Sequence, residues 1–120
     1  MVLESAHSLA LRDGYPVAPG HILVIPRRHV AGVFDLRPEE WDDLWALVRR
    51  IPGEVPELGA ADALNVGIND GPAAGQTVAH AHVHLIPRTL GDVPDPRGGV
   101  RWVLPASADY WTQQRTREST

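Results

Sequence analysis

The chain has 120 residues, no cysteine and a formal net charge of −4. Its length suits one domain with a real hydrophobic core, while the missing cysteines exclude disulfides and thiolate metal sites. The acidic balance argues against an extended nucleic-acid surface, and the sequence predicts neither a membrane-spanning helix nor a signal peptide, so a cytoplasmic location is expected.

The first part of the chain predicts two strands joined by a turn. Residues Ser8 to Arg12 suit a short strand, and Asp13-Gly14-Tyr15-Pro16 suits a turn. From His21 to Pro26 the chain is apolar on both faces, which is typical of a central strand. Pro26 should mark the end of its pairing, because proline cannot donate to a strand ladder.

Residues 38–51 predict the main helix. Pro38 suits the first helical position, and acidic residues near the start and arginines near the end complement the helix dipole. Pro52 and Gly53 are expected to end the helix, which leaves residues 54–62 as a loop. The apolar stripe that should cover the sheet consists of Trp41, Leu44, Trp45 and Val48.

Residues 63–69 alternate between apolar and small or polar side chains, which predicts another strand. Side chains at every second position of a strand share one face of the sheet. If Leu64, Val66 and Ile68 join the core, Asn69 lies on the opposite face.

A glycine-containing loop over residues 70–77 follows, and it is too long for a two-residue hairpin turn. Gly75 lets the backbone approach a ligand closely, while Gln76 and Thr77 offer neutral hydrogen-bond donors. Consecutive backbone N–H groups in such a loop can form a nest that binds an anion.

Residues 80–86 alternate between histidine and apolar side chains, which predicts a strand with His80, His82 and His84 on one face. Three interpretations are open: ordinary satisfied polar side chains, ligands of a metal ion, or phosphorus chemistry in which one neutral imidazole attacks while others orient it and donate hydrogen bonds. The loop that leads directly into the histidines favours the third. The opposite, core-facing side should carry Ala81, Val83 and Leu85.

The remainder of the chain predicts little regular structure. Residues 88–99 suit a long loop, 100–104 suit a final short strand, and 112–120 suit a polar tail. Three residues could reach a polyphosphate or a base, but packing at the surface explains them at least as well, so they stay outside the predicted site: Arg97, Arg101 and Trp102.

Residues 80–86 resemble, over their whole length, the signature of the histidine triad (HIT) superfamily, in which histidines alternate with apolar residues. Asn69, Gly75-Gln76-Thr77 and Pro87-Arg88 are also similar to the surroundings of that signature. The resemblance implies an α+β fold with an antiparallel sheet of about five strands and one main covering helix. It further implies a single HIT domain over residues 1–111, a homodimer, and a nucleotidyl hydrolase or transferase of the Fhit or Hint kind.

The resemblance also implies roles for individual residues. His82 is the expected nucleophile, and His84 should donate to a non-bridging or leaving-group oxygen. His80 should orient the nucleophile and balance charge, helped by His29, which stands eight residues after His21 as in the Hint branch. The residues expected to bind the nucleotide are Asp13, His21, Asn69, Gly75, Gln76 and Thr77.

The predicted reaction is hydrolysis at the α-phosphorus of a dinucleoside polyphosphate or a nucleoside phosphoramidate, through a nucleotidyl-histidine intermediate and with release of AMP. A purine nucleotide is therefore the expected partner. No metal or other cofactor is required, although a divalent ion could accompany a polyphosphate. The alternatives are a phosphorylase or nucleotidyltransferase of the same superfamily, a zinc enzyme, and a nucleotide-binding module without catalysis.

Overall fold

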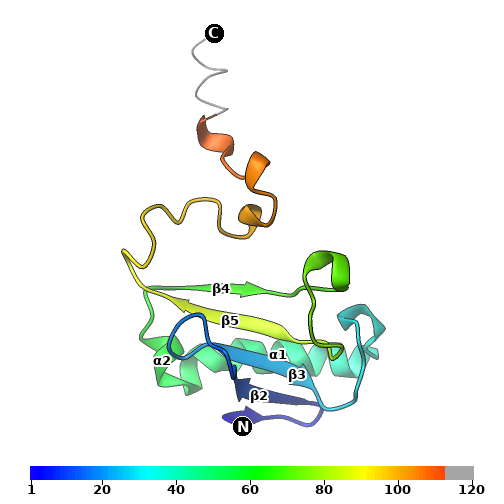
Figure 1. Cartoon of the computed structure of the whole chain (residues 1–120). Helices are drawn as coiled ribbons and strands as arrows, with labels where there is room; N and C mark the ends of the chain where they lie inside the picture. Colours follow the sequence, from blue (N-terminus) through cyan, green and yellow to red (C-terminus); the bar gives the residue numbers. More distant parts are fainter. Residues whose placement is uncertain (113–120) are drawn as a thin grey trace. The chain divides into compact units, whose positions relative to one another are not determined.

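The computed structural model describes residues 1–112 (Figure 1). Nearly all of the predicted polar tail at 112–120 lies outside the described residues. The chain divides into two compact units, Met1–Thr89 and a second unit that begins at Leu90. Whether the domain extends to residue 111 stays a prediction.

The first unit is built on a sheet of five antiparallel strands in the order β1-β2-β3-β5-β4. β2 has the predicted bounds, and β3 begins one residue later than predicted. β5 lies inside the sheet, between β3 and β4, and the predicted α+β architecture is confirmed. The strands are β1 (Leu3–Glu4), β2 (Ser8–Arg12), β3 (Ile22–Pro26), β4 (Ala63–Gly67) and β5 (Val83–Arg88).

The prediction that the histidine strand begins at His80 is wrong, because β5 begins at Val83. Its pairing with β3 starts only at the contact between Val24 and Val83. Just before this point the N–H of Ala81 donates to the carbonyl oxygen of Val30 at 2.7 Å. This bond pairs Ala81 with the segment after β3 and not with β3 itself, so the first two histidines of the signature precede the strand.

The main helix, α1 (Pro38–Glu54), runs along one face of the sheet and is longer than predicted (Figure 1). Pro52 lies inside it and removes only one donor from the helical ladder. The N–H of Val55 still donates to the carbonyl oxygen of Ile51 at 2.8 Å, so the ladder continues past the proline. A short second helix, α2 (Pro56–Gly59), occupies part of the predicted loop.

The core lies between α1 and the sheet. On the helix side Leu44, Leu47 and Ile51 are fully buried, and on the sheet side Val83 and Leu85 meet them as predicted. Each such side chain contributes roughly 1.5–3 kcal/mol by leaving water. The buried stripe is rotated from the predicted one, since large indole rings are seldom fully buried. The other members of the predicted stripe are only partly buried: Trp41, Trp45 and Val48.

β4 forms one edge of the sheet. Leu64 and Ile68 pack against the core as predicted. Val66 shares a face with its partner Leu85, yet it is 41% exposed, which corrects the prediction that it joins the core. α1 lies mainly over β2 and β3 and leaves this edge less covered.

In the second unit the predicted strand at 100–104 is wrong. Residues Gly99–Val103 form a 3₁₀ helix, and Pro105–Ser107 form another. Gly98 and Gly99 have φ of 95° and 46°, the left-handed region that favours glycine. They turn the chain so that the N–H of Arg101 donates to the carbonyl oxygen of Gly98 at 2.9 Å. This local turn overrides the strand preference of the Val-rich stretch.

Aromatic and arginine side chains hold the second unit together. The guanidinium of Arg97 lies 4.6 Å from the ring centroid of Trp111, and that of Arg101 lies 4.7 Å from the ring centroid of Tyr110. The indole N–H of Trp102 donates to the carbonyl oxygen of Arg97 at 2.7 Å.

None of the helices in residues 1–112 combines the length and apolar character that a membrane span needs.

Candidate active site

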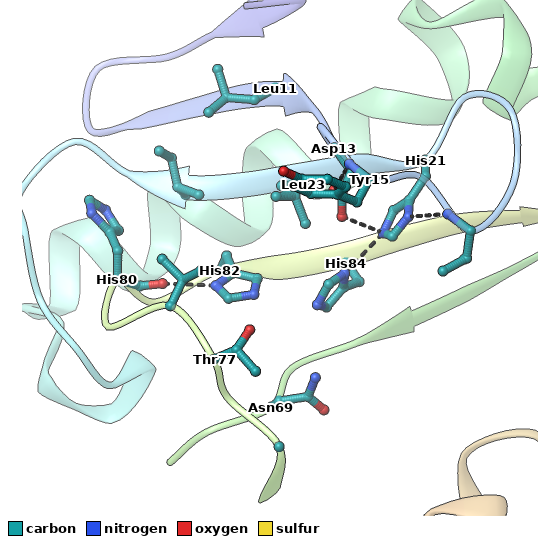
Figure 2. A pocket seen from close by; sticks show the side chains of 14 residues that line it. Leu11, Asp13, Tyr15, His21, Leu23, Asn69, Thr77, His80, His82 and His84 are labelled. Carbon is teal, nitrogen blue, oxygen red and sulfur yellow. Dashed lines mark hydrogen bonds and ion pairs between the residues drawn. The ribbon is translucent and has the colours of Figure 1, made fainter. Parts of the chain in front are cut away.

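A pocket of about 570 Å³ opens over β2, β3 and the start of β5 (Figure 2). Eight of the ten residues predicted to form the site line it, and His29 and Gln76 do not. The predicted residues in the lining are Asp13, His21, Asn69, Gly75, Thr77, His80, His82 and His84. The remaining lining residues are Leu11, Tyr15, Val17, Leu23, Ile25 and Val78.

His82 has one ring nitrogen held by the backbone and one that is available. Its Nδ1 lies 2.8 Å from the carbonyl oxygen of His80 (Figure 2). Because a carbonyl oxygen only accepts, Nδ1 carries the proton and the lone pair of the neutral ring is on Nε2. Within residues 1–112, Nε2 has no hydrogen-bond partner. The backbone of His80 thus leaves a free lone pair on Nε2 of His82, which is what the predicted nucleophile requires.

A relay of hydrogen bonds fixes the protonated nitrogen of His84. The N–H of Val17 donates to Nδ1 of His21 at 3.2 Å, so the neutral His21 ring carries its proton on Nε2. That Nε2 donates to Nδ1 of His84 at 2.9 Å. The proton of neutral His84 is therefore on its Nε2, and the network makes this ring a hydrogen-bond donor. The ring centroids of His82 and His84 are 4.9 Å apart, so the lone pair on His82 and the N–H of His84 belong to neighbouring rings.

Asp13 lies beside this relay. One carboxylate oxygen is 3.4 Å from Nε2 of His21, and the other accepts the N–H of Tyr15 at 2.8 Å. Burial lowers the pKa of His21, and the carboxylate of Asp13 partly opposes this. Burial also lowers the pKa of His84, and His82 and His21 lower it further. Both rings of the relay therefore favour the neutral state at pH 7.

His80 and His29 form a second histidine pair. Nε2 of His80 donates to the carbonyl oxygen of Pro26 at 2.8 Å, which leaves a lone pair on Nδ1. Nδ1 of His29 donates to that atom at 3.1 Å. The three imidazoles of the signature therefore do not share one strand face as predicted. The carbonyl oxygen of His80 accepts from the ring of His82. The ring of His80 fixes this segment through its bonds to Pro26 and His29.

Gln76 braces the loop before β5. Its side-chain oxygen accepts the N–H of Gly71 at 2.8 Å, and its side-chain nitrogen donates to the carbonyl oxygens of Ala31 and Val78 at 2.8 and 2.9 Å. The amide is thereby engaged within the loop. Gly75, with φ of 98°, places the backbone in the pocket lining.

Asn69 and Thr77 add an amide and a hydroxyl group to the pocket lining. Figure 2 shows both on the side of His82 and His84 that faces away from β2 and β3. Asn69 follows the end of β4 and reaches the histidine side of the sheet, where the alternation of residues 63–69 places it.

The apolar part of the pocket was not predicted. Leu11, Leu23 and Ile25 alternate along β2 and β3 with buried core residues, so the two-residue period of a strand could have identified them. Tyr15 and Val17 lie in the following loop, where no such period exists.

Within residues 1–112, one group of side chains could hold a metal ion. Ligand atoms of Asp13, His21 and His84 lie within 4.8 Å of one another. Two imidazoles and a carboxylate are a donor set that zinc accepts. The two rings are also bonded directly to each other, and this bond accounts for their closeness. A chelator distinguishes the two interpretations, because it removes a metal ion but leaves a hydrogen bond between the two rings intact.

The chain resembles known proteins over most of its length. The HIT domain family matches residues 1–90. A bis(5'-nucleosyl)-tetraphosphatase (asymmetrical) of Schizosaccharomyces pombe is 49% identical over 77 residues, which are 64% of this chain and 42% of that protein. A bis(5'-adenosyl)-triphosphatase of Dictyostelium discoideum is 49% identical over 85 residues, which are 71% of this chain and 57% of that protein.

A similar structure supports the same comparison. The diadenosine triphosphate hydrolase of Plasmodium falciparum superposes with a TM-score of 0.71 at 31% identity, over 78% of this chain and 64% of that one. The chain spans about half the length of the curated relatives it matches. Every residue of the predicted site lies within the matched residues 1–90.

Proposed function

The chain belongs to the HIT domain family, and from this premise we propose that it hydrolyses dinucleoside polyphosphates at the α-phosphorus and releases AMP. The names of its relatives favour a polyphosphate over a phosphoramidate. The observation that carries the proposal is the state of His82, whose Nδ1 is held by a carbonyl while Nε2 is available in a pocket.

In the first proposed step Nε2 of His82 attacks the α-phosphorus. A phosphorus–nitrogen bond forms and the bond to the leaving polyphosphate oxygen breaks. The substituted ring becomes cationic, because Nδ1 keeps its proton. The carbonyl oxygen of His80 stabilises that cation through the bond it already makes at 2.8 Å. In the second step water attacks phosphorus, the phosphorus–nitrogen bond breaks, and AMP leaves.

His84 is placed to assist both steps as a neutral donor. Its N–H can bond to a non-bridging oxygen or to the leaving oxygen as negative charge develops there. The lowered pKa of His84 suits this role. A second cation next to His82 would repel the positive charge that His82 acquires.

The nucleotide contacts follow from the positions of the other polar groups. Gly75, Thr77 and Asn69 line the pocket. In the proposal Gly75 and Thr77 bind the phosphate chain, and Asn69 holds its bridging or ribose side. Asp13 accepts from the ribose hydroxyls. His21 acts only indirectly, by positioning His84, because both of its ring nitrogens are already in hydrogen bonds. Gln76 shapes the phosphate loop through its bonds to the backbone.

We also propose a homodimer that uses the β4 edge. β4 ends the sheet, and Val66 on it is 41% exposed. An exposed edge strand is a ready template for pairing with a second copy. The mass of the particle in sedimentation tests this, and a monomer at micromolar concentration contradicts it. The cytoplasmic location stays a prediction.

The test of the reaction is AMP release from diadenosine triphosphate, diadenosine tetraphosphate and adenosine phosphoramidate. The native chain is compared with His82→Ala, and with His7→Ala as a control at an exposed histidine outside the pocket lining. Release should vanish in His82→Ala, persist in His7→Ala and survive EDTA. Turnover that His82→Ala leaves unchanged contradicts the mechanism. Loss with EDTA that added Mg²⁺ does not restore supports a metal at Asp13, His21 and His84.

The same assay separates hydrolysis from phosphorolysis. With diadenosine tetraphosphate and added inorganic phosphate, a hydrolase releases AMP and ATP, whereas a phosphorylase releases ADP and ATP without AMP, because phosphate takes the place of water in the second step. A chain that binds AMP but turns over none of the substrates is a binding module.

A further inference from the structure

Tyr15 is an aromatic side chain that the proposed mechanism leaves without a role. It is 93% exposed, although it belongs to the lining of the pocket. An exposed tyrosine ring leaves a large apolar surface in water without packing contacts. It lies at the same end of the pocket as Asp13 and His21 (Figure 2).

The backbone that carries Tyr15 is fixed even though its ring is free. The N–H of Tyr15 donates to the carboxylate of Asp13 at 2.8 Å. The residue after Tyr15 is Pro16, whose ring fixes its own backbone angle φ. The N–H of Val17 then donates to the buried ring of His21 at 3.2 Å. The backbone is thus held by hydrogen bonds at Tyr15 and at Val17, while the ring of Tyr15 is exposed.

The pocket offers a partner surface for a flat ring. Leu11 and Leu23 are paired neighbours on β2 and β3, and Ile25 follows on the same face of β3. These side chains form an apolar floor. Asp13 follows the end of β2, lines the same pocket and has a carboxylate that can accept from hydroxyl groups.

We propose that Tyr15 stacks on the base of the bound nucleotide and closes the apolar floor over it. The inference rests on the proposed function for the identity of the ligand. In the proposed arrangement the apolar floor contacts one face of the base, Tyr15 contacts the other face, and the carboxylate of Asp13 accepts from the ribose. A base has an aromatic face for stacking, whereas a phosphate or a sugar offers none. Tyr15 therefore determines the strength of nucleoside binding and takes no part in the chemistry.

The test is AMP binding to the native chain and to three variants, measured by calorimetry. Tyr15→Ala removes the ring but keeps the backbone N–H that bonds to Asp13. Loss of one stacked ring should weaken AMP binding roughly 5- to 150-fold. Tyr15→Phe should bind AMP like the native chain. Phe34→Ala is the control, because Phe34 is also an exposed aromatic residue at 77% but is absent from the pocket lining.

A loop effect and a stacking effect give different results. Stacking predicts unchanged thermal unfolding in Tyr15→Ala and a smaller loss of affinity for UMP than for AMP, because the pyrimidine presents a smaller face. AMP binding that is unchanged in Tyr15→Ala overturns the inference. An equal loss in Tyr15→Phe also overturns it, because the effect would then belong to the hydroxyl group.

Turnover supplies an independent readout. Tyr15→Ala should raise KM for diadenosine triphosphate and leave kcat nearly unchanged, as expected for an interaction made equally in the ground and transition states. If the native chain binds AMP without turning over any substrate, the proposed function fails, while the stacking of Tyr15 is still decided by the affinities. If turnover is confirmed and Tyr15→Ala behaves like the native chain, the inference alone fails.

Discussion

Replacing His21 with alanine tests whether this ring, which is only 3% exposed, acts through His84. The change removes the donor that lies 2.9 Å from Nδ1 of His84. A buried acceptor without a partner costs about 1–3 kcal/mol of stability. Without the donor, either nitrogen of His84 can carry the proton and the ring is free to turn.

The expected loss of kcat follows from that disorder. General acid–base help of the kind expected of His84 is worth roughly 10²–10⁴-fold, which sets the ceiling. A small misplacement of a catalytic group costs up to roughly 10²-fold. We therefore expect His21→Ala to lower kcat for AMP release by roughly 10- to 100-fold, and His84→Ala to lower it more.

The decisive variant is the double substitution. If His21 acts through His84, adding His21→Ala to His84→Ala should lower kcat little further, because the ring that His21 positions is already absent. Two independent losses that multiply would refute the reasoning. The rates are measured below the unfolding temperature of the least stable variant. If the alanine variant does not fold, His21→Asn replaces it, because asparagine keeps a side-chain acceptor for the N–H of Val17.

Two further predictions concern the supports of the site. Gln76→Ala should speed hydrogen exchange at the N–H of Gly71, because it removes the acceptor at 2.8 Å, and it should lower AMP release; unchanged exchange contradicts the bracing role. The hydrogen bonds from Arg28 lower the pKa of Glu40 from 4.5 to about 2, so the carboxylate adds stability above pH 4.5 that is lost as pH falls toward 2. The unfolding temperatures of the native chain and Glu40→Gln should differ at pH 7 and converge near pH 2, and a gap that stays constant with pH contradicts this.

The sequence predicts most of the site because short-range alternation determines where side chains point. The period of two along residues 80–86 places His84 and the core residues Val83 and Leu85 correctly. It fails for His80, since the start of a strand depends on pairing with distant residues. Here the N–H of Ala81 donates to the carbonyl oxygen of Val30, which lies outside β3, and pairing with β3 begins only at Val83.

The protonation pattern of the histidines could not be predicted from the sequence. It depends on the N–H of Val17 and the carbonyl oxygen of Pro26, which lie far from the signature along the chain. The same limit applies to the apparent strand at 100–104. Its Val-rich composition favours a strand, but Gly98 and Gly99 adopt left-handed φ and begin a 3₁₀ helix instead.

The central claim is that two successive displacements occur at phosphorus, with His82 as the first nucleophile. The most direct test uses a dinucleoside polyphosphate made chiral at the α-phosphorus by sulfur, hydrolysed in isotopically labelled water. Each in-line displacement inverts the configuration, so attack by His82 followed by attack of water predicts overall retention in the released nucleoside phosphorothioate. Overall inversion would show that water attacks directly and would contradict the nucleotidyl-histidine intermediate.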